Sequence, residues 1–307
     1  METEIKVLDH GYVRYINHMG GEEDIIRAAR MSTQKGFLGW DKFVCMTCKA
    51  EQAAHPDFMK SYKQNPDIWH LPCEYCKGKT ELVKGDEKLL EYLYKNKHMT
   101  PFEMLELCLQ IKLPIFVVRE VHRHRTFSYN EMSARYIQMP NEHYVPEVRM
   151  QDTKNKQGSL SADEVAFASN QDFKNNVRLE QDRIYAQYEV DLRAGIAKEV
   201  ARINTPVGRY TVMWMKGNLR NWLQFLQLRM APNAQWEIRQ YANAVASIIR
   251  ELWPRTYELF EEYTLNSYML FRSEIATLVL AHSTANTDAK FADLNNLNDL
   301  LTKLERK

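Results

Sequence analysis

The chain has 307 residues, of which 45% are hydrophobic, enough for a substantial core in one large domain with additions or in two domains. Its 41 basic and 40 acidic residues nearly cancel, so the overall charge does not direct the chain towards nucleic acid or an anionic membrane. No apolar run has transmembrane length, and the first residues lack the apolar core of a signal peptide. We therefore expect a cytoplasmic protein with reduced cysteines and no membrane partner.

Helical and strand periods are mixed along the chain. Hydrophobic spacing predicts helices over 22–32 and 86–97, with Asp86 placed to cap the second helix or to face its dipole. Apolar residues at every second position from 105 to 113 predict a strand with one buried face. Later elements are a long helix ending near 193, a helix from about 197, a strand over 210–215, and helices over 219–228 and 234–252. Because strands and helices do not alternate strictly, the predicted class is α+β.

A change in composition marks residues 37–85 as an inserted module. The module holds four of the five cysteines, as two Cys-x-x-Cys pairs, and has little clean periodicity. Four thiolates at such spacing are typical of a closed structural zinc site, to which we assign no catalytic role. The predicted ligands are Cys45, Cys48, Cys73 and Cys76.

Two histidines of the same module, His55 and His70, are rival ligands. The fifth cysteine, Cys108, falls on the predicted strand and is assigned to packing. Because a closed site is structural, the effect of metal loss is expected to stay local to the module.

The span 123–135 carries the most informative chemistry of the chain. It combines three arginines with a histidine, a glutamate, two serines and an asparagine, directly after the apolar run 114–118, and no hydrophobic period runs through it. Guanidinium groups bind phosphate with two parallel hydrogen bonds, and small polar side chains read a base or a sugar. The span therefore predicts a site for a small phosphorylated ligand, against the alternative of a solvated loop with surface ion pairs.

Residues 123–136 reproduce the signature RHRxxSxNxxSxRY, and in this the chain resembles the flavin-dependent thymidylate synthases. Other segments that match in the same order are 27–32, 98–103, 199–202, 218–220, 228–229 and 234–238. The resemblance extends over most of 5–263 and skips the module. It implies a synthase core over 1–264 with that family's fold, interrupted by the module at 37–85 and followed by a C-terminal helical extension over 265–307.

The resemblance also implies a reaction. It would be the reductive methylation of dUMP to dTMP by a flavoprotein methyltransferase of nucleotide biosynthesis. Methylenetetrahydrofolate would give the methylene, FAD the hydride, and NADPH would reduce the FAD again. The family resemblance further implies a homotetramer with active sites shared between subunits, and no nucleic-acid partner.

Residue roles carry over by the same resemblance. Arg229 matches the residue beside N3 of the pyrimidine and is the implied catalytic group. The implied FAD-binding residues are Ser32, His98, Thr100, Arg123, His124, Arg125, Glu131, Asn218, Arg220 and Gln224. The implied dUMP-binding residues are Glu120, Arg123, Glu131, Met132, Ser133, Ala134, Arg135, Arg202 and Arg229.

Some positions depart from the family pattern. Glu120 stands where glutamine is common, Gln224 where asparagine or histidine is usual, and Asn233 where a histidine often lies. Two other functional classes stay open at this point. One is a zinc-ribbon protein that binds nucleic acid, and the other is a flavoprotein that binds nucleotide without catalysis.

Overall fold

The structure is a computed structural model that describes residues 4–53, 71–153, 156, 158–159, 167–267, 270–275 and 277. Internal contacts divide the chain into two compact units, Met1–Tyr257 and Glu258–Lys307. Helix α9 (Pro254–Phe260) crosses that boundary, and the π-helix η4 (Glu261–Leu265) belongs to the second unit. Among the described residues, no helix is both long enough and apolar enough to cross a membrane. The mixture of helix and sheet confirms the predicted α+β class.

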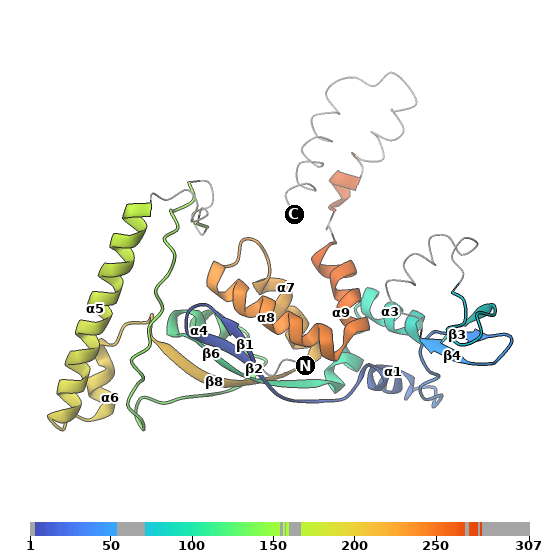
Figure 1. Cartoon of the computed structure of the whole chain (residues 1–307), viewed down its shortest axis with the longest axis horizontal. Coiled ribbons are helices and arrows are strands. Elements are labelled where there is room, and N and C mark those ends of the chain that lie inside the picture. Colours follow the sequence, from blue (N-terminus) through green and yellow to red (C-terminus); the bar gives the residue numbers. More distant parts are fainter. Residues whose placement is uncertain are drawn as a thin grey trace, which may run out of the picture. The chain divides into compact units, whose positions relative to one another are not determined.

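An antiparallel sheet of five strands forms the centre of the first unit (Figure 1), in the order β1-β2-β6-β8-β7. The strands are β1 (Glu4–Val7), β2 (Gly11–Met19), β6 (Glu106–Pro114), β7 (Ser128–Glu131) and β8 (Tyr210–Asn218). The predicted strand over 105–113 is confirmed as β6. Its inner residues Leu107, Leu109 and Leu113 are fully buried, and it pairs with β2 and β8.

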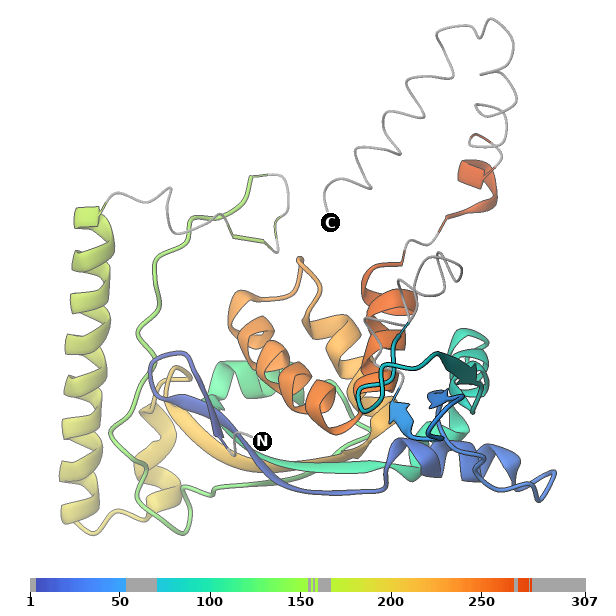
Figure 2. The same ribbon diagram turned by 45° about the vertical axis from the view of Figure 1, so that its right-hand side comes forward.

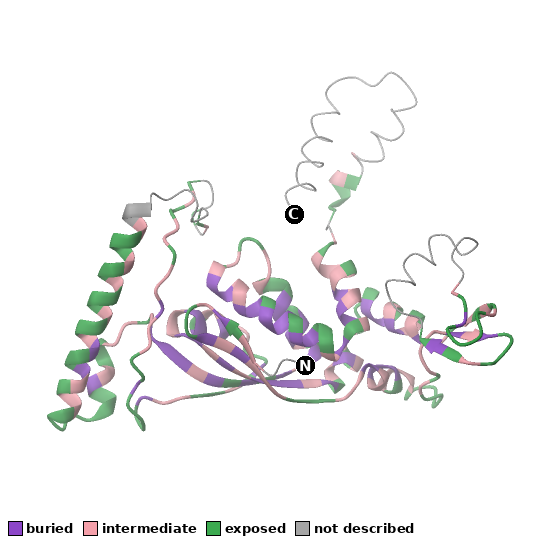
Figure 3. Ribbon diagram, viewed as in Figure 1, coloured by how far each residue is buried: buried purple, intermediate pink, exposed green. Residues whose placement is uncertain are grey.

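Three helices cover one face of this sheet (Figures 1 and 2), namely α4 (Ile115–Val121), α7 (Leu219–Arg229) and α8 (Trp236–Leu252). Helix α8 buries Ile238, Val245 and Ile249 completely, and Figure 3 shows the same concentration of buried residues on α8 and the strands below it. The indole of Trp222 donates a hydrogen bond to the carbonyl of Leu107, 3.1 Å away, which ties α7 to the sheet. The two helices predicted over 219–252 are thereby confirmed.

Different helices lie at the two ends of the sheet (Figures 1 and 2). One end has α1 (Glu22–Arg30), α3 (Glu87–Lys95) and the 3-10 helix η1 (Thr100–Met104). The other end has α5 (Phe167–Arg193), α6 (Lys198–Ala201) and the 3-10 helix η3 (Arg202–Asn204). Most of the described length of α5 is exposed (Figure 3).

The module at 37–85 forms a second, small sheet of order β4-β3-β5. Its strands are β3 (Lys42–Cys45), β4 (Glu51–Ala53) and β5 (Thr80–Val83). Strands of three or four residues are too short to show a period, which is why the sequence pattern did not reveal them. His55 and His70 lie outside the described residues.

Candidate active site

The arginine-rich motif forms a tight turn between α4 and β7. The hydroxyl of Tyr129 donates to the carbonyls of Val121 at 3.0 Å and His124 at 2.8 Å. Burial raises the pKa of Tyr129 to about 12, so the hydroxyl keeps its proton at neutral pH. With the turn held in this way, the side chains of Arg123 and Arg125 are exposed and available to a ligand.

Behind the turn, Phe127 packs into the core against Trp222, with ring centroids 4.7 Å apart. A Cβ atom at Gly217 would lie 2.4 Å from the ring of Phe127, so glycine in β8 permits this close approach. The turn is therefore supported by the sheet as well as by Tyr129.

Arg229, at the C-terminal end of α7, donates hydrogen bonds to three acceptors, which belong to Glu120 and His124. Its Nη1 lies 2.6 Å from a carboxylate oxygen of Glu120, its Nη2 lies 2.9 Å from the Glu120 carbonyl, and its Nε lies 2.9 Å from Nε2 of His124. The arginine side chain is only 15% exposed. The guanidinium is thus a fixed, partly desolvated cation with a defined orientation.

His124 accepts from Arg229 only while its ring is neutral. Burial, with a smaller contribution from the Arg229 charge, lowers the pKa of His124 to about 4. The folded state therefore binds fewer protons at this residue than the unfolded chain, whose histidine titrates near 6.5. Stability from this site is fully present above about pH 6.5 and is lost as the pH falls towards 4.

We accordingly predict that the stability difference between the wild type and His124→Gln shrinks as the pH is lowered from 6.5 to 4. Glutamine can still accept from Arg229 but cannot become charged. Urea unfolding at half-unit pH intervals measures this difference. Parallel stability curves for the two proteins over that range would show that His124 does not titrate as the geometry requires.

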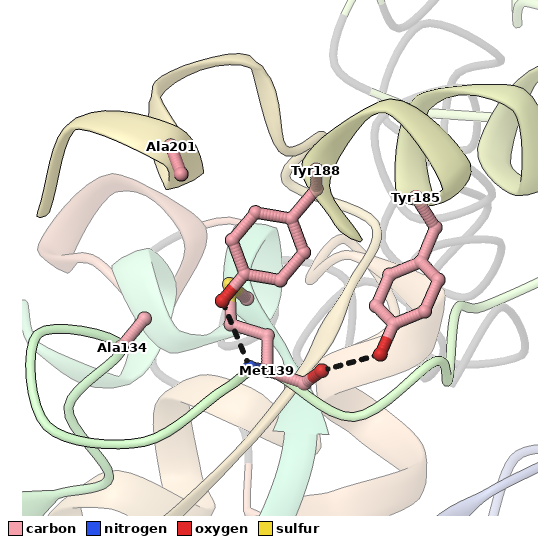
Figure 4. Packing of buried hydrophobic residues seen from close by; sticks show 5 residues of the cluster. All are labelled: Ala134, Met139, Tyr185, Tyr188 and Ala201. Carbon is pink, nitrogen blue, oxygen red and sulfur yellow. Dashed lines mark hydrogen bonds between the residues drawn. The ribbon is translucent and has the colours of Figure 1, made fainter. Parts of the chain in front are cut away.

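The second half of the motif lies against α5 and α6 instead. Ala134 is buried there with Met139, Tyr185, Tyr188 and Ala201 (Figure 4). The hydroxyl of Tyr185 donates to the Met139 carbonyl at 3.0 Å, and the Met139 amide donates to the Tyr188 oxygen at 3.2 Å. The side chain of Ala134 therefore faces protein.

Charged residues flank this segment. Glu131 accepts a hydrogen bond from the Thr211 hydroxyl at 2.8 Å, and Arg135 pairs with Glu199 at 3.1 Å on the surface. Met132 and Ser133 lie between them and are half-buried. Arg202 begins η3, directly after α6.

Other predicted flavin residues gather where β8 meets α7 and η1. The side chain of Asn218 accepts from the Asn221 amide at 3.0 Å and so caps α7. Arg220 pairs with Glu103 of η1. The predicted residues His98, Thr100 and Gln224 are exposed. The rings of His98 and Tyr92 are nearly perpendicular, with their centroids 5.7 Å apart.

The predicted residues thus form separate groups. Glu120, His124 and Arg229 come together, whereas Arg135 and Arg202 lie beside α6 at one end of the sheet. Ser32 follows α1 at the other end, where it is exposed (Figure 1). Within the described residues of one chain, these groups do not make a single enclosed site.

A cavity of about 1190 Å³ opens beside Arg229. Besides Glu120 and Arg229, its lining includes Arg149, Glu237 and Arg239. Glu237 is only 2% exposed, pairs with Arg149, and accepts from the Tyr144 hydroxyl at 3.2 Å. Sequence reasoning assigned Glu237 no role, although it lies in the matched segment 234–238. The lining holds three arginines and four acidic residues, and two of the arginines are already paired, Arg229 with Glu120 and Arg149 with Glu237.

The four predicted metal ligands do come together. The sulfur atoms of Cys45, Cys48, Cys73 and Cys76 all lie within 4.8 Å of one another. Hydrogen bonds from the backbone, above all from the Cys48 amide, lower the pKa of Cys45 to about 6, which favours its thiolate at neutral pH. The donor set fits a soft, tetrahedral metal ion.

The arginine-rich turn, and the fixed guanidinium beside a large cavity, are features of a protein that binds a phosphorylated small molecule such as a nucleotide. The sequence profile of the family described as "Thymidylate synthase complementing protein" matches residues 14–255. A flavin-dependent thymidylate synthase of Thermus thermophilus is 36% identical over 277 residues, which is 89% of this chain and 84% of that protein. The enzyme of the same description from Treponema denticola is 32% identical over 308 residues, covering 98% of each. The chain belongs to the family of flavin-dependent thymidylate synthases.

The fold agrees with a solved relative. The UMP/dUMP methylase PolB from Streptomyces cacaoi, solved with 5-Br UMP, superposes with a TM-score of 0.63. The match covers 85% of this chain and 98% of PolB at 24% sequence identity. The predicted family fold is therefore confirmed.

Proposed function

We propose that this chain converts dUMP and methylenetetrahydrofolate, with NADPH and a proton, to dTMP, tetrahydrofolate and NADP⁺. The methylene carbon replaces the proton on C5 of the pyrimidine and gains a hydride, which makes it the methyl group. Bound FAD in its reduced form would supply the hydride, and NADPH would then reduce the flavin again. The single observation that carries the proposal is the orientation of Arg229 by Glu120 and His124 beside a large cavity.

Arg229 is the proposed catalytic residue. A fixed cation beside N3 of the pyrimidine would stabilise negative charge there and so activate C5 towards the one-carbon unit. Because Glu120 and neutral His124 already orient the guanidinium, little reorganisation is needed when the charge develops. Glu120 can only accept hydrogen bonds while ionised, so its proposed part is to hold Arg229.

The remaining roles follow the family resemblance and fit the exposure of the side chains. Exposed Arg123, Arg125 and Arg220 are suited to the diphosphate of FAD, because each offers a planar donor fork. Arg135 and Arg202 are proposed to hold dUMP from the other end of the sheet, and Arg123 is proposed to contact dUMP as well as FAD. Because the groups are separate in one chain, we propose a homotetramer in which another copy completes each site.

We propose one structural Zn²⁺ in the module at 37–85, with no catalytic role. The domain assignment proposed here is a synthase core over 1–264, interrupted by that module, and an extension over 265–307. A nucleic-acid-binding protein is the alternative, but the balanced charge of the chain does not favour it.

The test of the proposed function has two parts. Purified protein should be yellow with flavin absorbance, and it should form dTMP when given dUMP, methylenetetrahydrofolate and NADPH. A colourless, folded protein would exclude the flavoenzyme. A yellow protein that binds dUMP and forms no dTMP would instead support a flavoprotein without this catalysis.

Exchanging either Arg123 or Arg135 for lysine should weaken dUMP binding at least several-fold. Lysine keeps the positive charge, but an ammonium group cannot reproduce the planar fork of a guanidinium. Titration of the flavin spectrum with dUMP measures the affinity, and Arg193→Lys at the end of α5 serves as the matched control. Unchanged affinity in both motif variants would remove these residues from the ligand site.

A further inference from the structure

The two cysteine pairs of the module form the same turn twice. The sequences are Cys45-Met-Thr-Cys48-Lys-Ala and Cys73-Glu-Tyr-Cys76-Lys-Gly. The amide of the first cysteine donates to the carbonyl of the sixth residue at 2.9 Å in both turns, and the fifth residue donates back to the first cysteine, at 3.1 Å and 2.9 Å. That fifth residue, a lysine, has a positive φ of 61° in one turn and 59° in the other. The repetition shows a built arrangement rather than a chance cluster.

The sulfur positions suit one tetrahedral ion. Three of the sulfur pairs are 3.5 Å apart, namely Cys45–Cys76, Cys48–Cys73 and Cys48–Cys76. Four thiolates at about 2.3 Å from a zinc ion would be about 3.8 Å apart. A disulfide needs sulfur atoms about 2.05 Å apart, so all four cysteines are free thiols.

The chain leaves and re-enters the core through a narrow neck, which consists of residues 38–41 and 85–87. A Cβ atom at Gly85 would lie 2.3 Å from the carbonyl oxygen of Gly39, so the two segments of the neck cross in direct contact. The Asp86 amide donates to Gly39 at 2.9 Å, and the Gly85 amide donates to the Asp41 carboxylate at 2.6 Å. The module is therefore not attached by loose linkers.

The neck contacts the C-terminal end of α1. Asp86 has a side chain that is only 1% exposed, and it forms an ion pair with Arg30, the last residue of that helix. Its second oxygen accepts from the Leu38 amide at 2.8 Å. Asp86 was expected to cap or face the dipole of α3, and it makes no side-chain cap hydrogen bond there. Its carboxylate joins the neck to α1 instead.

The same neck reaches the N-terminal end of α1 through Arg255. The Nε of Arg255 lies 3.3 Å from Glu87, its Nη1 lies 3.6 Å from Glu22, and its guanidinium lies 4.5 Å from the ring centroid of Trp40. Glu22, the first residue of α1, is 5% exposed and accepts from the Thr256 amide at 2.6 Å. Asp86 of the neck thus pairs with the last residue of α1, and Arg255, which contacts Glu87 and Trp40 of the neck, also pairs with the first.

We propose that the four cysteines hold one Zn²⁺. We also propose that the module, when it holds the metal, acts as a brace, which means that it stabilises α1 and the segment that follows it. Loss of the ion releases the neck, loosens α1, and weakens flavin binding at Ser32. The sequence favoured a purely local effect of metal loss, whereas the contacts of Asp86 and Arg255 couple the module to the core. The flavin part of this inference rests on the proposed function; the zinc and α1 parts do not.

The experiment uses the whole chain and three variants. Cys73→Ser/Cys76→Ser removes two ligands, Asp86→Asn weakens the neck without touching a ligand, and Cys108→Ser is the matched control for loss of a thiol. Zinc content is measured by plasma emission, and amide hydrogen exchange is followed in α1 and, for comparison, in β6. Flavin affinity is measured by fluorescence titration.

We expect one zinc per chain in the wild type and in the Cys108 and Asp86 variants, and none in the double variant. Exchange in α1 should become at least tenfold faster in the double variant and in Asp86→Asn, with β6 unchanged in both. Flavin affinity should fall several-fold in the same two proteins. If the double variant does not fold, removal of zinc from the wild type by a chelator tests whether α1 depends on the metal, and Asp86→Asn tests the contact between the neck and α1.

Each other outcome overturns a stated part. Folded wild-type protein with no metal, or with iron in place of zinc, overturns the zinc assignment. Zinc lost without faster exchange in α1 overturns the brace. Faster exchange with unchanged flavin affinity overturns the extension to flavin, and dTMP formation by the unmodified protein then still tests the proposed function separately.

Discussion

Replacing Arg229 with alanine is expected to lower kcat for dTMP formation about a hundredfold. Loss of one preorganised charged contact to a transition state typically costs about 3 kcal/mol, which corresponds to that factor. Because the contact is made to charge that develops in the reaction, kcat should fall much more than KM rises. Steady-state kinetics with varied dUMP measures both constants.

Two further variants separate catalysis from structure. Arg229→Lys keeps a charge but loses the fork that meets Glu120 and His124, so we expect an intermediate loss. Arg183→Ala removes an arginine from a surface pair with Glu180 and should leave kcat near the wild-type value. If Arg229→Ala forms dTMP at nearly the normal rate while retaining flavin, the guanidinium is not the activating group.

Elements long enough to contain several hydrophobic repeats were predictable from the sequence, and shorter elements were not. The alternation over 105–113 indicated β6 because one face of that strand is buried along its whole length. The strands of the module escaped detection because three or four residues hold too few repeats. Their fold depends on the sulfur cluster and on the contacts of Gly85 and Asp86, which join residues about 45 positions apart in the chain.

The candidate site shows a similar division. The motif correctly indicated a family and a set of polar residue types, because those are properties of local sequence. It could not indicate that Glu120 and His124 would meet Arg229, more than 100 residues away, or that the cavity beside it would include Glu237. Asn218, expected at the flavin, also caps α7, a structural role that its position before a helix could have suggested.

Arg209 is a second buried arginine, and nothing in the sequence pattern pointed to it. It is fully buried directly before β8, and its guanidinium lies 4.6 Å from the ring centroid of Tyr185. Its nitrogens donate to the side chain of Asn141 at 2.9 Å and to the carbonyl of Gln181 in α5 at 2.9 Å. Arg209 thereby joins the sheet, the segment after the motif, and α5.

Arg209→Ala is expected to reduce the free energy of unfolding by about 3 kcal/mol or more. The substitution opens a cavity beside Tyr185 and removes the donor of the partly buried Gln181 carbonyl. For a unit of this size, such a loss lowers Tm by about 6–12 °C. Calorimetry of the flavin-loaded protein measures the shift. Tyr185→Phe is the control: it removes the two hydrogen bonds of the hydroxyl, to the Met139 carbonyl and from Gln138, and should cost about 1–2 kcal/mol.

The same variant also links stability to the ligand site. Because Arg209 anchors α5, its loss should disturb the packing of Ala134 against Tyr188 and so weaken dUMP binding by way of the neighbouring Arg135. Arg209→Lys keeps the charge but cannot span both Asn141 and Gln181, so its Tm should lie between those of the wild type and the alanine variant. A Tm for Arg209→Ala within about 2 °C of the wild type would mean that the guanidinium contacts add no net stability. Normal melting together with weakened dUMP binding would instead place Arg209 in the positioning of the ligand segment alone, since the cost of its buried charge would then offset its hydrogen bonds.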